Sequence, residues 1–351
     1  MFQYLFSNPL NWALALVNKG LDDMNYIAPW WLPGGQAQTI WPAIYARHQQ
    51  TKATASITVY QRERWTTPDG DFMDLDWLDM PPASTLLVLF HGLEGSSSSH
   101  YALAFADYAR QHGYNYVVPH FRGCSGQINL APRAYHSGDF EEIGWVLQGL
   151  RQKHSGRILA LGVSLGGNAL LRWAEEAGHS ASLLVDAIAS LSAPVDLAAS
   201  GQAIGRGLNR QLYTRMFLAS MKPKALRKLA QYPGLFDEQA LHAAKDLHAF
   251  DNVFTAPLHG FKNTDDYWAR ASAKPHLASI QVPTLLVNAR NDPFVPDHSL
   301  PHARSVGKNV TLWQPRHGGH VGFAAGRPPG HLRSLPEQVG VWLTTQSASH
   351  G

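Results

Sequence analysis

Short apolar runs and longer amphipathic runs alternate along the middle of the chain. Between residues 86 and 191 the apolar runs are short, as in LLVLF (86–90) and RILALGV (157–163), and runs such as FEEIGWVLQGLRQKH (140–154) place apolar residues every three or four positions. Near-continuous apolar strands are typical of parallel sheets that are buried on both faces by amphipathic helices. The pattern therefore predicts an α/β fold with a mostly parallel central sheet and helices on both faces.

Two departures from this alternation complete the predicted architecture. Residues 57–79 hold two alternating runs around the turn sequence PDGD (68–71), which predicts an N-terminal antiparallel hairpin. Residues 196–279 lack the strand pattern and look helical, whereas apolar runs return at VPTLLV (282–287) and NVTLW (309–313). A helical insertion between two strands of one sheet is predicted to form a cap over the carboxyl edge, where α/β sheets bind ligands.

Residues 1–26 are predicted to form an N-terminal extension, in part helical, ahead of one domain over residues 27–351. The extension is apolar and aromatic, but it lacks the basic start and the small-residue cleavage site of a signal peptide. Its uninterrupted apolar stretch, WALALV (12–17), is too short to span a bilayer. Two interpretations stay open, a helix packed on the protein's own surface or an amphipathic anchor in weak contact with a membrane.

Charge and cysteine content narrow the classes of function. A formal net charge of +3 is too small for a nucleic-acid-binding protein, which concentrates Lys and Arg on one face. The main basic cluster, KPKALRK (222–228), is interpreted as a solvated helix face. The single cysteine, Cys124, excludes an intramolecular disulfide and a Cys-rich zinc site, and it favours a cytoplasmic location. No cofactor and no protein partner is indicated.

The most specific motif is G-x-S-x-G, in the stretch LALGVSLGGNALL (159–171), where an apolar strand runs directly into a helix. This context predicts a nucleophile elbow, a sharp strand-to-helix turn that exposes the hydroxyl of Ser164 above the sheet. Gly162 and Gly166 are expected where side chains would collide with neighbouring backbone, and the amino end of the helix favours negative charge. The elbow makes the predicted architecture an α/β-hydrolase fold.

A serine nucleophile needs a histidine base that is itself oriented by a carboxylate, and α/β hydrolases place them in the order Ser, acid, His. Asp292 follows one predicted strand and His320 follows the next, so both are expected at the same sheet edge as Ser164. Asp196 and Asp297 are alternatives for the acid, although either could instead cap a helix.

Two histidines compete for the role of base in PRHGGHVGF (315–323). As a metal site the pair lacks support, because no Asp, Glu or Cys lies within ten residues on either side and the glycines make a flexible loop. No metal site is therefore predicted. The apolar VGF that follows His320 can anchor the loop in the core, so His320 is predicted to be the base and His317 a surface or bracing residue.

The oxyanion of an acyl-transfer reaction needs two backbone N–H donors. Leu165, directly after the nucleophile, is predicted to supply the first. Leu93, in the loop HGLEG (91–95) after an earlier strand, is predicted to supply the second. His91 in this loop is interpreted as a structural residue.

Several longer motifs point to one family. They are HGLEGSSSSHY, HFRGCSG, RAYHSGD, GVSLGGN, FDNVFTAPLHGF, DYWARAS, NARNDPFVP and GGHVGF, and the opening YIAPWWLPGGQAQTIWP fits the pattern P-x-W-L-x-x-G-x-x-Q-T. The set resembles the YheT-like branch of the α/β-hydrolase superfamily, bacterial esterase-like proteins related to eukaryotic α/β-hydrolase-domain phospholipases. The resemblance covers about residues 27–345 and implies Ser164 as nucleophile, Asp292 as acid and His320 as base.

Other residues in these motifs have no assigned chemistry. Arg122 could buttress the active-site loop or bind an anionic group such as phosphate, and the structural role is favoured. Tyr135 and His136 are expected to order the loop before a helix. Cys124 lies outside any elbow and is interpreted as a buried small residue.

The combined features predict a serine hydrolase that cleaves carboxylic esters, of short to medium acyl chains or of lipids, through an acyl-enzyme. Apolar stretches in the helical insertion, such as YPGLF (232–236), offer surface for an acyl chain. Two alternatives stay open: acyl transfer to an alcohol by the same residues, and a catalytically silent homologue that binds lipid.

Overall fold

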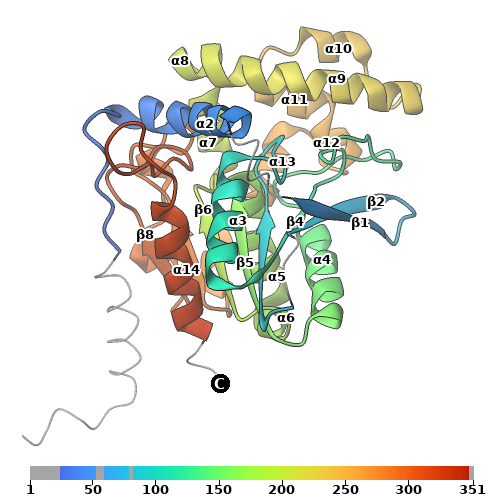
Figure 1. Cartoon of the computed structure of the whole chain (residues 1–351). Coiled ribbons are helices and arrows are strands. Elements are labelled where there is room, and N and C mark those ends of the chain that lie inside the picture. The colour runs from blue at the N-terminus through green and yellow to red at the C-terminus, as the bar shows by residue number, and fades with distance from the viewer. Residues whose placement is uncertain (1–23, 53–58, 79–81, 348–351) are drawn as a thin grey trace, which may run out of the picture.

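The computed structural model describes residues 24–52, 59–78 and 82–347 (Figure 1). The predicted extension over residues 1–26 lies almost entirely outside these ranges, so its two interpretations remain predictions. None of the helices in the described ranges combines the length and the apolar character that a membrane span requires.

One eight-stranded sheet runs through the described part of the chain, in the order β1-β2-β4-β3-β5-β6-β7-β8. β1 pairs with β2 and β2 with β4 in antiparallel fashion, whereas all other neighbours are parallel. The predicted α/β-hydrolase fold with an N-terminal hairpin is confirmed. The strands are β1 (Tyr60–Thr66), β2 (Phe72–Leu78), β3 (Thr85–Phe90), β4 (Asn115–Pro119), β5 (Arg157–Val163), β6 (Ala187–Leu191), β7 (Thr284–Val287) and β8 (Val310–Trp313).

Helices cover both faces of the sheet, as Figure 1 shows. Successive strand residues point to opposite faces, so Val88 packs with α4 (Phe140–Lys153) and α5 (Leu165–Ala177) on one side. Leu87 packs with α3 (His100–His112) and α14 (Ser334–Ser347) on the other side. Two apolar layers therefore hold the parallel strands, as the near-continuous apolar runs predicted. Short elements complete this part: η1 (Gly178–Ser180), α6 (Ala181–Leu184), η4 (Asp297–Ser299) and η5 (Ala303–Ser305).

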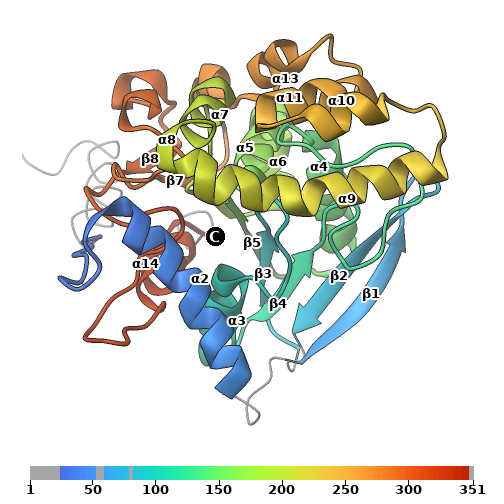
Figure 2. The ribbon, with the colours of Figure 1, turned by 90° about the horizontal axis from the view of Figure 1, so that it is seen from above.

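Helices alone connect β6 to β7. They lie above the carboxyl edge of the sheet, and α9 crosses over the strands when the molecule is seen from above (Figure 2). A short π-helical turn, η2, joins α8 to α9. The elements are α7 (Leu197–Ile204), α8 (Gly207–Asn209), η2 (Arg210–Thr214), α9 (Arg215–Gln231), α10 (Glu238–Ala243), α11 (Leu247–Val253), α12 (Thr255–Leu258), α13 (Thr264–Ala271) and η3 (Lys274–Ser279).

A helix that the sequence pattern did not predict, α2 (Gly34–Lys52), precedes the sheet. Its sequence begins with two glycines, contains Pro42 and shows no regular apolar period, which conceals it from pattern analysis. The helix lies beside α8 and η2, because the side chain of Gln36 bonds Asn209 and Tyr213 at 2.7 and 2.6 Å. Pro42 has no N–H, so the Gln38 carbonyl four residues earlier lacks its intrahelical donor.

Candidate active site

Ser164 stands on a strained turn between β5 and α5. Its backbone has φ 52° and ψ −118°, a conformation that L-residues rarely adopt. A Cβ at Gly162 would lie 2.4 Å from the Gly166 carbonyl oxygen, and a Cβ at Gly166 would lie 2.4 Å from the His91 carbonyl oxygen. Only glycine fits at both positions, which is the crowding expected of a nucleophile elbow.

The structure brings together the three residues that the sequence singled out. His320 Nε2 lies 3.0 Å from Ser164 Oγ, and His320 Nδ1 lies 2.8 Å from Asp292 Oδ2. The Asp292 side chain is fully buried and the His320 side chain is 11% exposed. A neutral imidazole that donates from Nδ1 to the carboxylate can accept the serine proton at Nε2.

The acid and the base are both held in place by neighbouring groups. Asp292 Oδ1 accepts the backbone N–H groups of Phe294 and Val295 at 2.7 and 3.3 Å, which leaves Oδ2 for the histidine. The Phe294 ring packs on the His320 ring with 4.2 Å between their centroids. The loop after β7 therefore orients the carboxylate and also covers one side of the imidazole.

The alternative acids are engaged elsewhere. Asp196 accepts the N–H of Ala199 as the N-cap of α7 and forms an ion pair with Lys274 at 3.3 Å. Asp297 forms an exposed ion pair with Arg290 at 3.5 Å. In the described structure the His320 ring bonds Asp292 and neither of these residues.

His317 is exposed, and its Nδ1 lies 3.4 Å from the side-chain nitrogen of Asn291. It does not contact Ser164, so the two histidines of the loop differ sharply in their surroundings. Among the described residues, no group of three or more His, Cys, Asp or Glu side chains is arranged to hold a metal ion.

The loop after β3 presents one candidate oxyanion donor. The Gly92 N–H bonds the Tyr101 hydroxyl, the Glu94 N–H bonds the Tyr135 hydroxyl, and the Gly95 N–H bonds the Gly92 carbonyl. Within the described structure this leaves the Leu93 N–H without an acceptor. Leu93 lines the same cavity as Ser164.

Leu165 is the first residue of α5, a position where a backbone N–H has no intrahelical acceptor. Its N–H and that of Leu93 are therefore the two candidate donors. Both ring nitrogens of buried His91 are used, Nδ1 at 2.8 Å from the Gly92 carbonyl and Nε2 at 3.1 Å from the Phe121 N–H. Burial lowers the pKa of His91 to about 3, so the ring is neutral and braces the loop.

A cavity of about 150 Å³ opens beside Ser164, between the sheet and the helices that connect β6 to β7. Its walls are mainly apolar. The apolar side chains include those of Leu197, Ile204, Phe217, Met221, Leu247, Phe250, Phe254, Trp268 and Phe294. The hydroxyl of Ser164 thus faces a space that an acyl chain can enter.

The basic cluster 222–228 is not a solvated helix face, contrary to its interpretation from sequence. Lys224 and Lys228 lie one helical turn apart and both line the cavity. Lys228 is 1% exposed and donates to the carbonyls of Asn129 and Ala131 at 2.6 and 2.9 Å, and burial lowers its pKa to about 8. Lys224 pairs with Glu94 at 2.9 Å. Backbone carbonyls and a carboxylate draw these ammonium groups inward.

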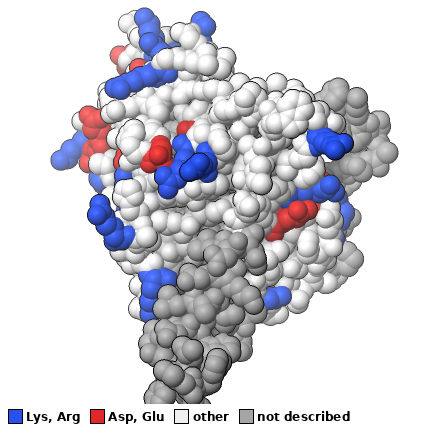
Figure 3. Space-filling view, turned by 90° about the vertical axis from the view of Figure 1, so that its left-hand side faces the viewer, with Lys and Arg blue, Asp and Glu red and all other residues white. Residues whose placement is uncertain are grey.

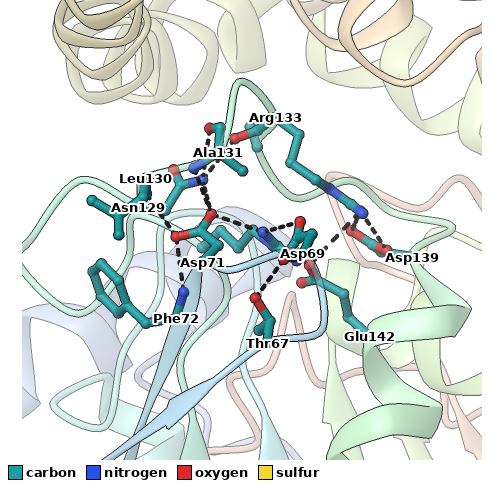
Figure 4. A network of polar contacts seen from close by, with 12 residues as sticks. Thr67, Asp69, Asp71, Phe72, Asn129, Leu130, Ala131, Arg133, Asp139 and Glu142 are labelled. Atoms are coloured by element: carbon teal, nitrogen blue, oxygen red, sulfur yellow. Dashed lines mark hydrogen bonds and ion pairs between the residues drawn. The ribbon is translucent and has the colours of Figure 1, made fainter.

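Arg122, which lines the cavity, also holds a buried polar network with the acidic side chains of Asp69, Asp71 and Glu142 that Figure 4 shows. Its side chain is 4% exposed, bonds Asp69 and Asp71 at 2.8 and 2.7 Å, and contacts Glu142. The Asp71 carboxylate also accepts the N–H groups of Leu130 and Ala131 at 2.6 and 3.0 Å. These partners tie the hairpin turn to α4 and to the loop 121–133, which matches the structural role favoured for Arg122.

The remaining motif residues also act within loops. His136 Nδ1 accepts the Gly138 N–H at 3.1 Å, and burial lowers the pKa of this ring to about 4. Tyr135 donates its hydroxyl to the Glu94 carboxylate at 3.0 Å. Cys124 is partly buried, and desolvation raises the pKa of its thiol to about 11, so it is a poor nucleophile.

Three residues of the quoted motifs contact the site although the sequence assigned them no role. Gln38 and Thr39 belong to the opening motif, and both contact the His320 loop. Tyr101, next to the loop after β3, fixes the Gly92 amide. No spacing rule links such residues to the triad, because only the tertiary fold brings them near.

Comparisons with known proteins agree with this fold. A family model described as the alpha/beta hydrolase fold matches residues 85–326. "Putative esterase YheT" of Escherichia coli (strain K12) is 38% identical over 88% of this chain and 89% of its own length. "Phospholipase ABHD3" of Mus musculus is 31% identical over 76% of this chain and 67% of its own length.

Among solved structures, Est1E from Butyrivibrio proteoclasticus with bound ferulic acid is similar with a TM-score of 0.51 and 17% identity, over 83% of this chain and 99% of that one. At this identity the likeness shows the fold alone. The family match covers well over half of the chain, and the similarity to the bacterial relative covers 88% of it. The chain therefore belongs to the α/β-hydrolase family, in the YheT-like branch.

Proposed function

We propose that this protein is a serine hydrolase that cleaves carboxylic esters through a Ser164–His320–Asp292 triad. The observation that carries the proposal is the continuous set of contacts from the serine hydroxyl to the imidazole at 3.0 Å and from the imidazole to the carboxylate at 2.8 Å, at the mouth of an apolar cavity. The two relatives, one named as an esterase and one as a phospholipase, support ester chemistry.

In the proposed reaction Ser164 Oγ attacks the ester carbonyl carbon while His320 Nε2 takes its proton. The carbonyl oxygen becomes an oxyanion that accepts the N–H groups of Leu93 and Leu165. His320 then returns the proton to the leaving alcohol, and the acyl group stays on Ser164. Water, deprotonated by the same imidazole, attacks the acyl-enzyme and releases the acid. Asp292 holds the imidazolium that forms in each half-reaction.

The helical segment 196–279 is proposed to be the cap of this site. Its apolar side chains form much of the cavity wall, so short to medium acyl esters or lipid esters are the proposed substrates. A further relative, 26% identical, is "Monoacylglycerol lipase" of Saccharomyces cerevisiae, whose name refers to a lipid ester. The cytoplasmic location predicted from the single cysteine stays part of this proposal.

A fluorophosphonate probe tests the mechanism directly, because it forms a covalent bond only with an activated serine. The wild-type chain is expected to be labelled at Ser164 and to hydrolyse p-nitrophenyl butyrate, and Ser164→Ala is expected to lose both properties. Ser182→Ala serves as a control, since Ser182 is exposed on α6 and its hydroxyl bonds the His179 carbonyl at 3.0 Å. Equal labelling of wild type and Ser164→Ala would contradict the proposal.

A further inference from the structure

We propose that the first turns of α2 act as a clamp that positions both the acid and the base of the triad, with Gln38 and Thr39 as positioning residues. This inference rests on the proposed function. The helix precedes the residues that the family model matches, and neither residue contacts the substrate cavity.

Gln38 joins the acid loop to the base loop through one oxygen atom. Its Oε1 accepts the backbone N–H of Gly318 and the side-chain N–H of Asn291, both at 2.9 Å. Asn291 directly precedes Asp292, and Gly318 lies two residues before His320. The Gln38 side chain is buried, and its own N–H₂ donates to the Leu32 carbonyl at 2.9 Å. Since a backbone N–H can only donate, the orientation of this amide is fixed.

Thr39 holds the base itself. Its Oγ1 accepts the backbone N–H of His320 at 2.9 Å and donates to the Gly35 carbonyl at 2.7 Å, so the hydroxyl connects the helix backbone to the base. A Cβ at Gly322 would lie only 2.0 Å from the Gln38 carbonyl oxygen, which is the oxygen that Pro42 leaves without an intrahelical donor. The helix and the loop are therefore in direct backbone contact.

The loop requires such external support. Val321 and Phe323 have φ values of 55° and 46°. Positive φ values are unfavourable for residues with β-branched or bulky side chains. Strained conformations persist only where the surrounding structure enforces them. On one side of the His320 loop Ser192 Oγ accepts the Val321 N–H at 3.1 Å, and on the other side α2 supplies Gln38 and Thr39.

Isosteric variants of Thr39 test the clamp. Thr39→Val removes the acceptor for the His320 N–H at nearly constant volume, and Thr39→Ser keeps it. We expect Thr39→Val to lower kcat for p-nitrophenyl butyrate by about tenfold or more with little change in KM, because a misplaced base affects the reaction step. Thr39→Ser is expected to remain within about threefold of wild type, and Gln38→Met to behave like Thr39→Val.

Gln36→Ala is the matched control, because Gln36 lies on the same helix and contacts Asn209 and Tyr213 instead of the loop. Thermal unfolding of each variant separates misplacement from loss of fold. If Gln38→Met does not fold, the Thr39 pair alone decides. Wild-type kcat in Thr39→Val, or equal losses in Thr39→Val and Thr39→Ser, would overturn the clamp.

An NMR spectrum of the His320 ring distinguishes failure of the clamp from failure of the proposed function. The clamp predicts that Thr39→Val changes the NMR chemical shift of the proton on His320 Nδ1 that bonds Asp292 and that Thr39→Ser leaves it unchanged, because only the first variant removes the acceptor of the His320 N–H. This readout needs no turnover. An inactive wild type would defeat the proposed function, whereas an unchanged Nδ1 proton shift in Thr39→Val would defeat the clamp.

A separate observation, on the outer face of the helical segment, supports a second inference. We infer that the face made by Leu208, Leu212 and Met216 docks on an anionic lipid surface. These side chains are spaced four residues apart along α8, η2 and α9, and they are 58%, 42% and 52% exposed. Large apolar side chains aligned in this way on one helix face are unusual for a surface in contact with water alone.

The basic side chains around this face favour an anionic partner over a neutral one. Residues 197–236 contain seven Lys or Arg and no Asp or Glu. Four of these are exposed arginines, and among the described residues none of them forms an ion pair: Arg206, Arg210, Arg215 and Arg227. In the face that Figure 3 shows, Lys and Arg side chains lie beside large areas of uncharged surface, with fewer acidic groups. Apolar side chains flanked by basic ones are typical of helices that lie on membranes.

Vesicle sedimentation tests this face with the full chain. We expect binding to phosphatidylcholine vesicles that contain phosphatidylglycerol, and weaker binding to phosphatidylcholine alone. Leu212→Glu with Met216→Glu is expected to reduce binding about tenfold or more. Leu183→Glu is the control, because Leu183 is 73% exposed on α6, at the opposite end of the molecule (Figure 1).

Three results would contradict the inference. Wild-type chain that stays in the supernatant with anionic vesicles has no such surface. Binding that survives the double substitution places the lipid contact elsewhere in the chain. A dimer in solution that the double substitution dissociates shows instead that a second copy covers the face. Hydrolysis of a water-soluble ester should be unchanged in all these variants, since Leu212 and Met216 do not line the cavity.

Discussion

His317 and His320 are three positions apart, yet only one of them is placed to move a proton. The His320 ring is bonded on both sides, to Ser164 and to Asp292, while His317 is exposed beside Asn291. We expect His320→Ala to lower p-nitrophenyl butyrate turnover by about 10³-fold or more and His317→Ala to change it by less than about threefold. The reverse ranking of the two variants would exclude the assignment of His320 as base.

At the scale of single residues, the sequence identifies candidate site residues where the chemistry requires a fixed order or spacing along the chain. Ser164, Asp292 and His320 could be selected because the elbow motif marks the nucleophile and the fold sets the order of its partners. Thr39 could not, since a hydroxyl that binds a backbone N–H 281 residues away leaves no local pattern. Lys228 was misjudged for the same reason, because the carbonyls that bury its ammonium group belong to a distant loop.

The Arg122 network joins elements rather than single residues. Removing its guanidinium leaves the buried Asp71 carboxylate without its cation and leaves Glu142 with Arg133 alone, at 3.7 Å. Breaking a buried ion pair in this way costs about 3–5 kcal/mol. We expect Arg122→Met to lower the free energy of unfolding, measured by urea denaturation, by about this amount. Arg122→Lys is expected to retain only part of the wild-type stability, because lysine lacks the planar guanidinium that bonds several carboxylates.

The control for this measurement is an exposed ion pair on the same side of the sheet. Lys153 contacts Glu63, and their side chains are 53% and 38% exposed. Lys153→Met is expected to change the free energy of unfolding by about 1 kcal/mol or less. A similarly small effect for Arg122→Met would show that the network does not hold the hairpin turn, the loop 121–133 and α4 together.

Asp251 makes the stability of the helical segment depend on pH. Its carboxylate accepts from Thr255 and Trp268 at 2.6 and 2.9 Å, and burial raises its pKa to about 6. The folded state therefore binds this proton more tightly than the unfolded state, and the stability that the protonated group contributes is lost as pH rises from about 4 to about 6.

Asp251→Asn keeps the shape but cannot ionise, and its amide oxygen can accept the Trp268 N–H while its amide nitrogen donates to the Thr255 hydroxyl. It is expected to be more stable than wild type at pH 8, by no more than roughly 3 kcal/mol, and the difference should vanish near pH 4. Urea unfolding at both pH values measures this. Asp265→Asn, at a side chain 81% exposed, should show no such gain, and a variant less stable than wild type at pH 8 would refute the role of Asp251.

Among whole elements, the strands and the helices that flank them followed from periodicity, whereas α2 did not. Buried strands must be apolar and their helices amphipathic, so β3 to β6 were visible as a pattern. The helix α2 has glycines at its start and Pro42 inside, and it is held by polar contacts of Gln36 and Gln38 with other parts of the chain. Contacts with distant parts of the chain stabilise α2, so a local sequence pattern does not predict it.

The whole molecule places an apolar cavity between a rigid sheet and a helical segment, and its size should limit the acyl chain. Met221 lines the cavity from α9, and Met216 lies on the outer side of the same helix. We expect Met221→Trp to lower kcat/KM for p-nitrophenyl octanoate about tenfold or more while that for the acetate ester stays within about threefold. Met216→Trp is the control, and equal effects on both esters would place the acyl chain elsewhere.

The contact between Thr39 and His320 also has a consequence for the order in which the protein matures. The helix α2 leaves the ribosome early, and the base loop follows only after the hairpin, the elbow and most of the sheet. Since domains begin to fold during synthesis, Ser164 can be seated on its strand long before the His320 ring is fixed. Under the proposed mechanism, the nascent chain would therefore hydrolyse no ester until α2 and the loop 315–323 are in contact.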